Sequence, residues 1–332
     1  MPESGHFFCS QFLIHNINIY TMNKYKTGPW LVLAAALLWA VDTPFRKFLT
    51  EGLTSTTIVF MEHIVIAFLV LPLLLPRLHE LKKLGWKEWA AVAFIALGGS
   101  VLATIFFTES FRYTNPSVSI LLQKIQPFIA IALAWLLLKE KLGKKFWLWA
   151  ALGIFGAYLV SFPEFKVSGL SFAGGSRGVT YALLAAFLWG GSTVFGRLVL
   201  DKISFQLMTA LRFLGALLFL FIAQIWIGTL PEISSATGKD WIYILIIAVL
   251  AGYISLLIYY KGLKSTKASV ATISELAFPF AAVVVNWVFL DATLSLVQIA
   301  GGIILLLAVA KLSLVNREDI VTQSTKVYNE AS

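Results

Sequence analysis

The sequence is poor in the residues that soluble proteins use on their surfaces and in metal or disulfide sites. Charged residues make up 13% of the 332 residues and hydrophobic ones 59%, whereas an average soluble domain is ~25% charged. The single cysteine, Cys9, excludes an intramolecular disulfide, and the four histidines lack the paired spacing of a metal site. No Gly-x-x-x-x-Gly-Lys-Ser/Thr motif occurs. We therefore expect a membrane protein that uses neither a metal nor another cofactor and does not hydrolyse ATP.

Ten apolar stretches follow one another along the chain. Each is close to the ~20 residues that a helix needs to cross ~30 Å of hydrocarbon, and the alternating segments of about ten residues typical of a barrel do not occur. The sequence therefore predicts an all-α integral membrane protein with ten transmembrane helices. The expected spans cover residues 30–48, 55–76, 89–108, 116–138, 146–163, 178–200, 204–227, 240–261, 268–290 and 295–314.

The second half of the sequence repeats the first at an offset of about 150 residues. Trp39 falls on Trp189 at 150, and Pro127 falls on Pro279 at 152. Because each copy holds an odd number of spans, the second must enter the membrane from the opposite side. Inverted five-helix repeats are typical of secondary transporters whose midplane site opens alternately to either face. The expected division is an N-terminal extension at 1–27, a first repeat at 28–163, a connection at 164–177, a second repeat at 178–315 and a cytoplasmic tail at 316–332.

The positive charge indicates an orientation rather than a nucleic-acid partner. The net charge is +9, and most of the 26 Lys and Arg residues fall in alternate connections, on the side of the two termini. The positive-inside rule then predicts a plasma-membrane protein with both termini in the cytoplasm. Residues 1–21 do not resemble a cleaved signal peptide, and Met22 opens a segment typical of a cytoplasmic N-terminus. Met22 is therefore a candidate translation start.

Motifs in both halves resemble the EamA family of the drug/metabolite transporter superfamily. They include Ala-Ala-Phe-Leu-Trp-Gly at 185–190, Ala-Leu-Arg-Phe at 210–213, and Ser-Val-Ser-Ile-Leu-Leu-Gln-Lys-Ile-Gln-Pro-Phe at 117–128 with its counterpart around Ser269 and Pro279. The resemblance covers about residues 28–315. It implies a cavity between the halves, lined by spans one to four and six to nine. The sequence departs from the pattern where Glu62-His63 stands in place of the Arg-Phe-like pair of many relatives.

The resemblance and the repeats together predict a secondary transporter that works by alternating access. The expected cargo is a small polar metabolite, an amino acid or related zwitterion, moved outward across the lipid bilayer with proton coupling as one energy source. A sugar-phosphate or nucleotide-sugar exchanger is the alternative, favoured by Lys124 and Arg212 and opposed by Glu62 and Glu275. A channel is a weaker alternative. An enzyme would need a nucleophile–base or metal set at one interface, and the sequence presents none.

Ionisable residues at membrane depth are the expected pathway residues, because a charge near the bilayer centre costs at least ~2.5–3.5 kcal/mol. Glu62 and Arg212 occupy equivalent positions in the two repeats. They are interpreted either as a buried ion pair between helices or as opposite charges on the cavity wall that select a zwitterion. Asp42 and Arg46, at i and i+4, are expected to form a local pair.

Two proline-containing spans carry the other charged candidates. Pro127 and Pro279 are expected to kink their helices and to free the carbonyls of Gln123 and Glu275. Irregular backbone at that depth is tolerated only where it faces protein or water, so both kinks are expected to border the cavity. Lys124 would attract an anionic group, and Glu275 would bind an amine or carry a proton.

Two further features have two interpretations each. Trp39 and Trp189 lie inside matching helices rather than at interfaces, so they either line the cavity or pack in the core. The glycines of spans five and ten, Gly153, Gly156 and Gly301-Gly302, either pack against their own repeats or form a homodimer.

Overall fold

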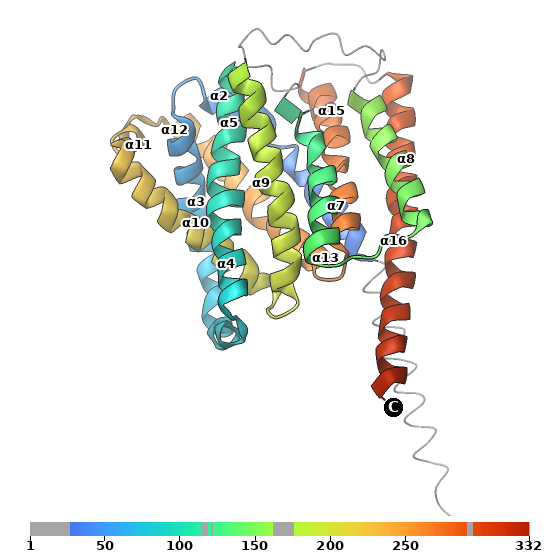
Figure 1. Cartoon of the computed structure of the whole chain (residues 1–332). Coiled ribbons are helices and arrows are strands. Elements are labelled where there is room, and N and C mark those ends of the chain that lie inside the picture. The colour runs from blue at the N-terminus through green and yellow to red at the C-terminus, as the bar shows by residue number, and fades with distance from the viewer. Residues whose placement is uncertain (1–26, 114–118, 121, 162–175, 291–294, 332) are drawn as a thin grey trace, which may run out of the picture.

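The computed structural model describes residues 27–113, 119–120, 122–161, 176–290 and 295–331. All regular structure within these residues is helical, and the helices stand side by side as a bundle (Figure 1). A helix satisfies its backbone hydrogen bonds internally, which hydrocarbon demands of any segment that crosses it. The expected N-terminal extension with Cys9 and Met22, and nearly all of the expected connection, lie outside the described residues.

Seven helices in the described part of the chain are long and apolar enough to cross a membrane. They are Thr27–Leu49, Ser55–Lys83, Trp86–Tyr113, Arg177–Leu200, Phe205–Ile227, Gly238–Leu263 and Leu296–Asn316. The remaining expected spans contain shorter helices, namely η3 (Gln123–Ile125) with α7 (Gln126–Leu137), α8 (Lys144–Ser161), and α14 (Ala268–Ser274) with α15 (Ala277–Leu290). The all-α membrane fold expected from the sequence is thus present.

Several of the long spans are divided into labelled elements. These are α2 (Asp42–Leu49), α3 (Ser55–Leu74), η1 (Leu75–Lys83), α4 (Trp86–Phe94), η2 (Ile95–Leu102), α5 (Ala103–Tyr113), α9 (Ser176–Leu200), α10 (Phe205–Ile227), α11 (Glu232–Ser235), α12 (Gly238–Ile246), η4 (Ile247–Ile254), α13 (Ser255–Leu263) and α16 (Leu296–Ala331). α16 continues through the segment expected as a tail and extends beyond the bundle (Figure 1).

Two π-helical stretches mark the third long span of each half. η2 begins at Ile95 and η4 at Ile247, which are 152 residues apart. This is the offset found in the sequence, so the duplication also appears in the local backbone. π-Helical turns inside α-helices occur frequently at functional sites.

α3 and α10, which are equivalent helices of the two halves, exchange capping groups at their ends. Glu80, just after α3, accepts the backbone N–H of Ser204 at 2.6 Å, and Ser204 is the N-cap of α10. Glu232, just after α10, accepts the backbone N–H of Thr54 at 3.1 Å and its hydroxyl at 2.7 Å, and Thr54 is the N-cap of α3. The start of each helix therefore lies beside the end of the other, so these two packed helices run antiparallel.

The glycines expected to mediate close helix packing do so between α8 and α16. A Cβ atom at Gly156 would lie 2.7 Å from the carbonyl oxygen of Gly301, and one at Gly301 would lie 2.7 Å from that of Gly156. Only glycine allows this approach. Gly156 and Gly301 therefore pack the two halves against each other, whereas the sequence had predicted packing within each repeat or a homodimer.

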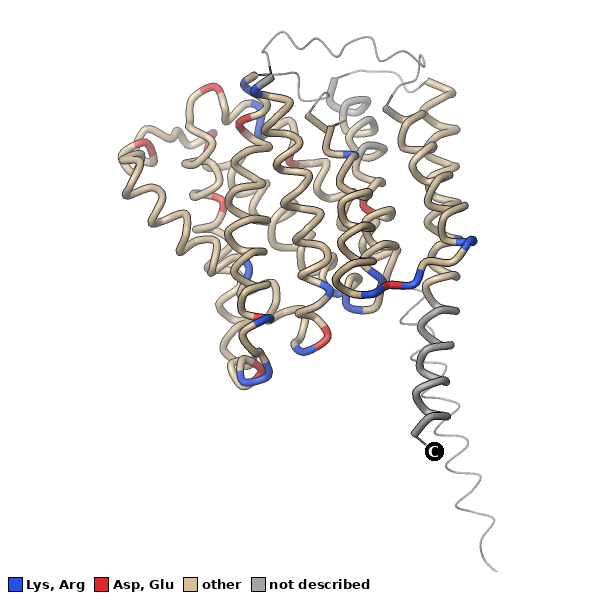
Figure 2. Tube along the Cα trace, in the orientation of Figure 1, with Lys and Arg blue, Asp and Glu red and all other residues tan. Residues whose placement is uncertain are grey.

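Positive charge gathers at one end of the bundle. Figure 2 shows Lys and Arg positions mainly at the lower end, where the connections after η1, α7, α9 and α13 lie. α16 leaves the bundle toward the same end. This distribution agrees with the charge pattern along the sequence.

Candidate functional site

A cavity of about 140 Å³ lies among the helices of both halves. It is lined by Trp39, Asp42, Thr43, Arg46, Glu62, His63, Ser100, Thr104, Phe107, Gln123, Gln126, Trp189, Ser192, Thr193, Arg212, Phe213, Ala251, Gly252, Leu256, Tyr259, Glu275 and Phe278. These residues come from the regions of spans one to four and six to nine. Among the described residues, α8 and α16 contribute none, which matches the arrangement that the family resemblance implied.

Arg46 holds the acidic side chains at one end of the cavity. Its side chain is only 2% exposed, and its Nε donates to Asp42 at 2.8 Å. One terminal nitrogen donates to Glu62 at 2.9 Å and the other to Thr108 at 3.1 Å. The local pair expected between Asp42 and Arg46 is therefore present. The helix continues to Leu49 and turns Arg46 into the bundle.

The interpretation of Glu62 and Arg212 as an ion pair was wrong. Glu62 pairs with Arg46 instead. Arg212 donates to the Ser100 hydroxyl at 2.6 Å, the Tyr260 hydroxyl at 3.0 Å and the Gly99 carbonyl at 3.3 Å. Both residues do line the cavity, as the second interpretation required. The two equivalent positions thus carry opposite charges. Arg46 neutralises Glu62, whereas hydrogen bonds hold Arg212.

Glu275 is buried where four helical segments meet. Its carboxylate accepts hydrogen bonds from Gln126 at 2.6 Å, from the Tyr259 hydroxyl at 2.9 Å and from Thr193 at 3.3 Å. Gln126 belongs to the first half, and the other three residues belong to the second. Three hydrogen-bond donors can stabilise a buried carboxylate without an ion pair. Glu275 also lines the cavity.

The two proline-containing spans are interrupted at equivalent positions. The 3₁₀ segment η3 precedes Pro127, and α14 ends one residue before Glu275. Neither carbonyl is free as expected. The backbone N–H of Gln126 donates to the Gln123 carbonyl, and the backbone N–H of Phe278 donates to the Glu275 carbonyl at 3.0 Å. The helices break and re-form with Pro127 in the first turn of α7, where a missing donor is harmless. The side chain of Pro279 lies outside the described residues.

The equivalent tryptophans Trp39 and Trp189 both line the cavity and both donate through Nε1. Trp189 donates to the Gly99 carbonyl in η2 at 2.8 Å, and Trp39 donates to Ser255, which follows η4, at 3.0 Å. Each indole thus reaches the π-helical region of the other half. Trp39 also contacts the Tyr259 ring at 5.3 Å between centroids. Of the two interpretations, cavity lining is the one that the structure supports.

Lys124 does not line the main cavity. It lies in an adjoining pocket of about 40 Å³ together with Gln123 and Pro127. Trp39, Gln123, Gln126, Glu275 and Phe278 line both spaces, so the two are contiguous.

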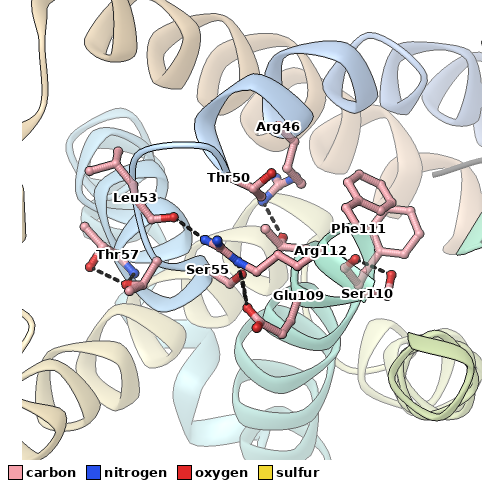
Figure 3. Close-up of polar contacts among 12 residues, drawn as sticks. Arg46, Thr50, Leu53, Ser55, Thr57, Glu109, Ser110, Phe111 and Arg112 are labelled. Carbon is pink, nitrogen blue, oxygen red and sulfur yellow. Dashed lines mark hydrogen bonds and ion pairs between the residues drawn. The ribbon is translucent and has the colours of Figure 1, made fainter. Parts of the chain in front are cut away.

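One end of the site is tied together by polar contacts between the α2–α3 connection and α5 (Figure 3). Arg112 forms an ion pair with Glu109 at 3.2 Å and donates to the Leu53 carbonyl. Ser55, at the start of α3, donates to Glu109 at 2.6 Å. These contacts hold the connection that follows Arg46 against α5, so they help to position Arg46 over the cavity.

Sequence reasoning missed several residues of the site. It gave Arg46 only a local pair with Asp42, and it did not select Gln126, Thr193, Tyr259 and Ser100. The repeat contained a usable signal for Thr193, because it falls on Thr43 at the same offset and both line the cavity. Tyr259 carried no such signal, since its importance comes from contacts between helices.

Comparison with known proteins identifies the family. The EamA-like transporter family matches residues 26–162 and again residues 176–314. The chain belongs to this family of transporters. It is 34% identical over 312 residues to the riboflavin transporter ImpX of Fusobacterium nucleatum subsp. nucleatum, covering 89% of this chain and 100% of that protein. It is 24% identical to an uncharacterized transporter of Synechocystis sp., covering 70% of this chain and 67% of that protein.

A solved structure supports the same fold. One crystal structure aligns with a TM-score of 0.68 at 16% identity, covering 88% of this chain and 98% of that chain. At this identity the likeness concerns the fold alone. The family match makes the protein a membrane transporter.

Proposed function

We propose that the protein carries a neutral, planar heterocycle of the flavin type, and that riboflavin is the cargo to test first. The lining of the cavity is the observation that carries this proposal. Aromatic rings stack well on planar ligands, and the aromatic lining residues are Trp39, Phe107, Trp189, Phe213, Tyr259 and Phe278. Hydroxyl and amide groups between them suit a polyhydroxyl chain. The full-length similarity to a protein named as a riboflavin transporter supports the same cargo.

The charges around the cavity favour an uncharged cargo. The main cavity and the adjoining pocket are lined by the cations Arg46, Lys124 and Arg212 and by the anions Asp42, Glu62 and Glu275. These formal charges balance, and most of the groups already bind protein partners. A strongly anionic cargo such as a sugar phosphate or nucleotide sugar is therefore less well supported, because Arg46 already forms two ion pairs.

Alternating access between two inverted five-helix repeats is the mechanism we propose. The antiparallel packing of α3 and α10 supports an inverted relation between the halves, as do the matched π-helical stretches. The cavity lies between the halves, where a rocking motion would expose it to each face in turn. In this scheme ten helices cross the plasma membrane, both termini are cytoplasmic, and Glu275 is the proton-coupling residue.

A zwitterion such as an amino acid is the second candidate cargo. Glu275 and Arg212 both line the cavity, and neither forms an ion pair with another described residue. An ammonium group near Glu275 and a carboxylate near Arg212 would use these charges. A cargo of this kind would leave the aromatic lining without a specific role.

Counterflow in proteoliposomes tests the proposal. Vesicles preloaded with riboflavin should accumulate labelled riboflavin transiently, which distinguishes a carrier from a channel. Unlabelled riboflavin should compete, whereas amino acids and sugar phosphates should not. Trp189→Ala should reduce counterflow at least tenfold, because a stacking face is lost. Trp226→Ala is the matched control, since Trp226 is 90% exposed on the surface of α10. Competition by amino acids but not by riboflavin would instead support the second candidate cargo, a zwitterion.

A further inference from the structure

The adjoining pocket lies between the two interrupted spans and is built from equivalent positions of both halves. At the 152-residue offset, Ile120 corresponds to Thr272, and Lys124 to Leu276. Gln123 corresponds to Glu275 in the same way, and all of these residues line the pocket. The pocket is therefore shared by the halves, but its polar groups are arranged asymmetrically. Broken helices of this kind form the binding sites of many transporters.

Three buried polar atoms in this pocket lack hydrogen-bond partners within the described part of the chain. They are Gln123 Oε1, Lys124 Nζ and Thr272 Oγ1. Glu275 lines the same pocket, but its carboxylate is occupied by Gln126, Tyr259 and Thr193. A buried ammonium without a partner is costly in hydrocarbon, and such a residue marks a functional site. A ligand group that satisfies all three atoms would remove this cost.

The donor and acceptor capacities of the three atoms restrict what that group can be. The Lys124 ammonium only donates, the Gln123 amide oxygen only accepts, and the Thr272 hydroxyl does either. An ionised carboxylate or phosphate has no hydrogen for Gln123. A ligand ammonium would be repelled by Lys124. A group with an N–H beside carbonyl oxygens satisfies all three atoms.

We infer that the pocket between the interrupted spans binds the imide edge of the cargo, with Lys124 and Thr272 donating to carbonyl oxygens and Gln123 accepting the imide N–H. A flavin ring has such an edge at one end, and its planar body would lie in the aromatic main cavity that opens from the pocket. This inference rests on the proposed function and specifies which face of the cargo enters first.

Binding of modified flavins to the unaltered protein tests the inference without any mutation. Riboflavin and N3-methylriboflavin differ only in the imide N–H, so their affinities are compared by fluorescence quenching on the purified protein. We expect N3-methylation to weaken binding by about tenfold or more, since a buried acceptor is then left unpaired. Equal affinity for the two flavins would overturn the inference.

Variants then assign the contact to its residues. Gln123→Met should weaken riboflavin binding and abolish the difference between the two flavins, because the acceptor is gone in both cases. Lys124→Met and Thr272→Val should weaken both flavins by similar factors. Lys144→Met is the matched control, since Lys144 is exposed near the start of α8. Unchanged riboflavin affinity in both Lys124→Met and Gln123→Met would overturn the inference.

Binding of the phosphorylated flavin FMN distinguishes an imide contact at Lys124 from a phosphate contact. If Lys124 served a phosphate, FMN would bind more tightly than riboflavin and lose that advantage in Lys124→Met, which would overturn the imide assignment. Failure of the proposed function has a different signature, because the unaltered protein would then neither bind nor exchange any flavin. Retained riboflavin exchange with indifference to N3-methylation would contradict the imide contact alone.

Discussion

The rings of His63 and Phe213 meet edge to face with 5.4 Å between their centroids. The two residues are 150 positions apart, and they lie on the antiparallel helices α3 and α10. Contact between equivalent residues is what a twofold relation between the halves produces at its axis. The adjacent residues Glu62 and Arg212 bind separate partners, Arg46 and Tyr260.

The first prediction concerns the buried charges around Arg46. Arg46→Met should leave Asp42 and Glu62 as adjacent buried carboxylates, costing about 3–5 kcal/mol of stability and lowering the Tm in detergent. Lys82→Met, on the exposed end of η1, is the control.

A double-mutant cycle locates the partner of Glu62. Glu62→Gln should couple to Arg46→Met and should be additive with Arg212→Met to within about 0.5 kcal/mol. A larger coupling between Glu62 and Arg212 would mean that they interact across the halves after all.

The second prediction concerns Glu275. Glu275→Gln retains hydrogen-bonding capacity toward Gln126, Tyr259 and Thr193 but cannot carry a negative charge. We expect this variant to insert and fold, to lose net transport driven by a pH gradient, and to retain substrate exchange. Measurements use proteoliposomes with and without an imposed gradient. Glu51→Gln, at an exposed position after α2, is the control. Normal pH-driven accumulation in Glu275→Gln would return Glu275 to a structural role.

The third prediction concerns Glu232, which caps the start of α3. Burial alone would raise the pKa of Glu232, but hydrogen bonds from Thr57 and Thr54 outweigh burial and hold this pKa below its usual range. Such a carboxylate stabilises the fold above its unfolded-state pKa, near ~4.3. The stabilisation disappears as the pH falls through the lower folded-state pKa.

Thermal unfolding tests this cap. Glu232→Gln should cost about 0.5–2 kcal/mol near neutral pH, and its Tm should approach that of the unaltered protein as the pH is lowered toward about 3. Glu109→Gln is a useful comparison, because it breaks an ion pair without removing a helix cap. A difference in Tm that is independent of pH would contradict the role assigned to the Glu232 carboxylate.

The fourth prediction concerns orientation. In a background with Cys9 replaced by serine, cysteine at Ser235 should react with a membrane-impermeant thiol reagent on intact cells. Cysteine at Lys83 should react only after the cells are permeabilised. Both positions are exposed. Lys83 follows α3 and Ser235 follows α10, so the two lie at opposite ends of this antiparallel pair. The reverse labelling pattern would place the termini outside the cell.

The sequence predicted the all-helical membrane fold because hydrophobic length is a local property. It also predicted that Glu62, Arg212 and Glu275 lie at a cavity, since charged residues in apolar spans have few other locations. Their partners could not be predicted. Arg46 reaches Glu62 only because of how the helix end is rotated into the bundle, and no spacing rule reports that rotation.

The effect of the prolines on the backbone could not be predicted from the sequence either. The rule that proline frees a carbonyl four residues earlier assumes that the helix continues. At Pro127 the preceding turn tightens into η3, and the Gln123 carbonyl finds a new donor in the Gln126 amide. Such a local adjustment depends on neighbouring helices, which a single segment cannot reveal.

The exchange of caps between α3 and α10 makes the halves mutually dependent. Thr54 receives its acidic partner from the second half, and Ser204 receives its partner from the first. Each half alone therefore lacks one carboxylate acceptor at the start of its helix, α3 or α10. If the chain were severed between residues 162 and 175, each fragment would carry a helix start with unmet amide groups until the other fragment was present. Assembly from two pieces should therefore be concerted, with each fragment serving as the template on which the other completes its fold.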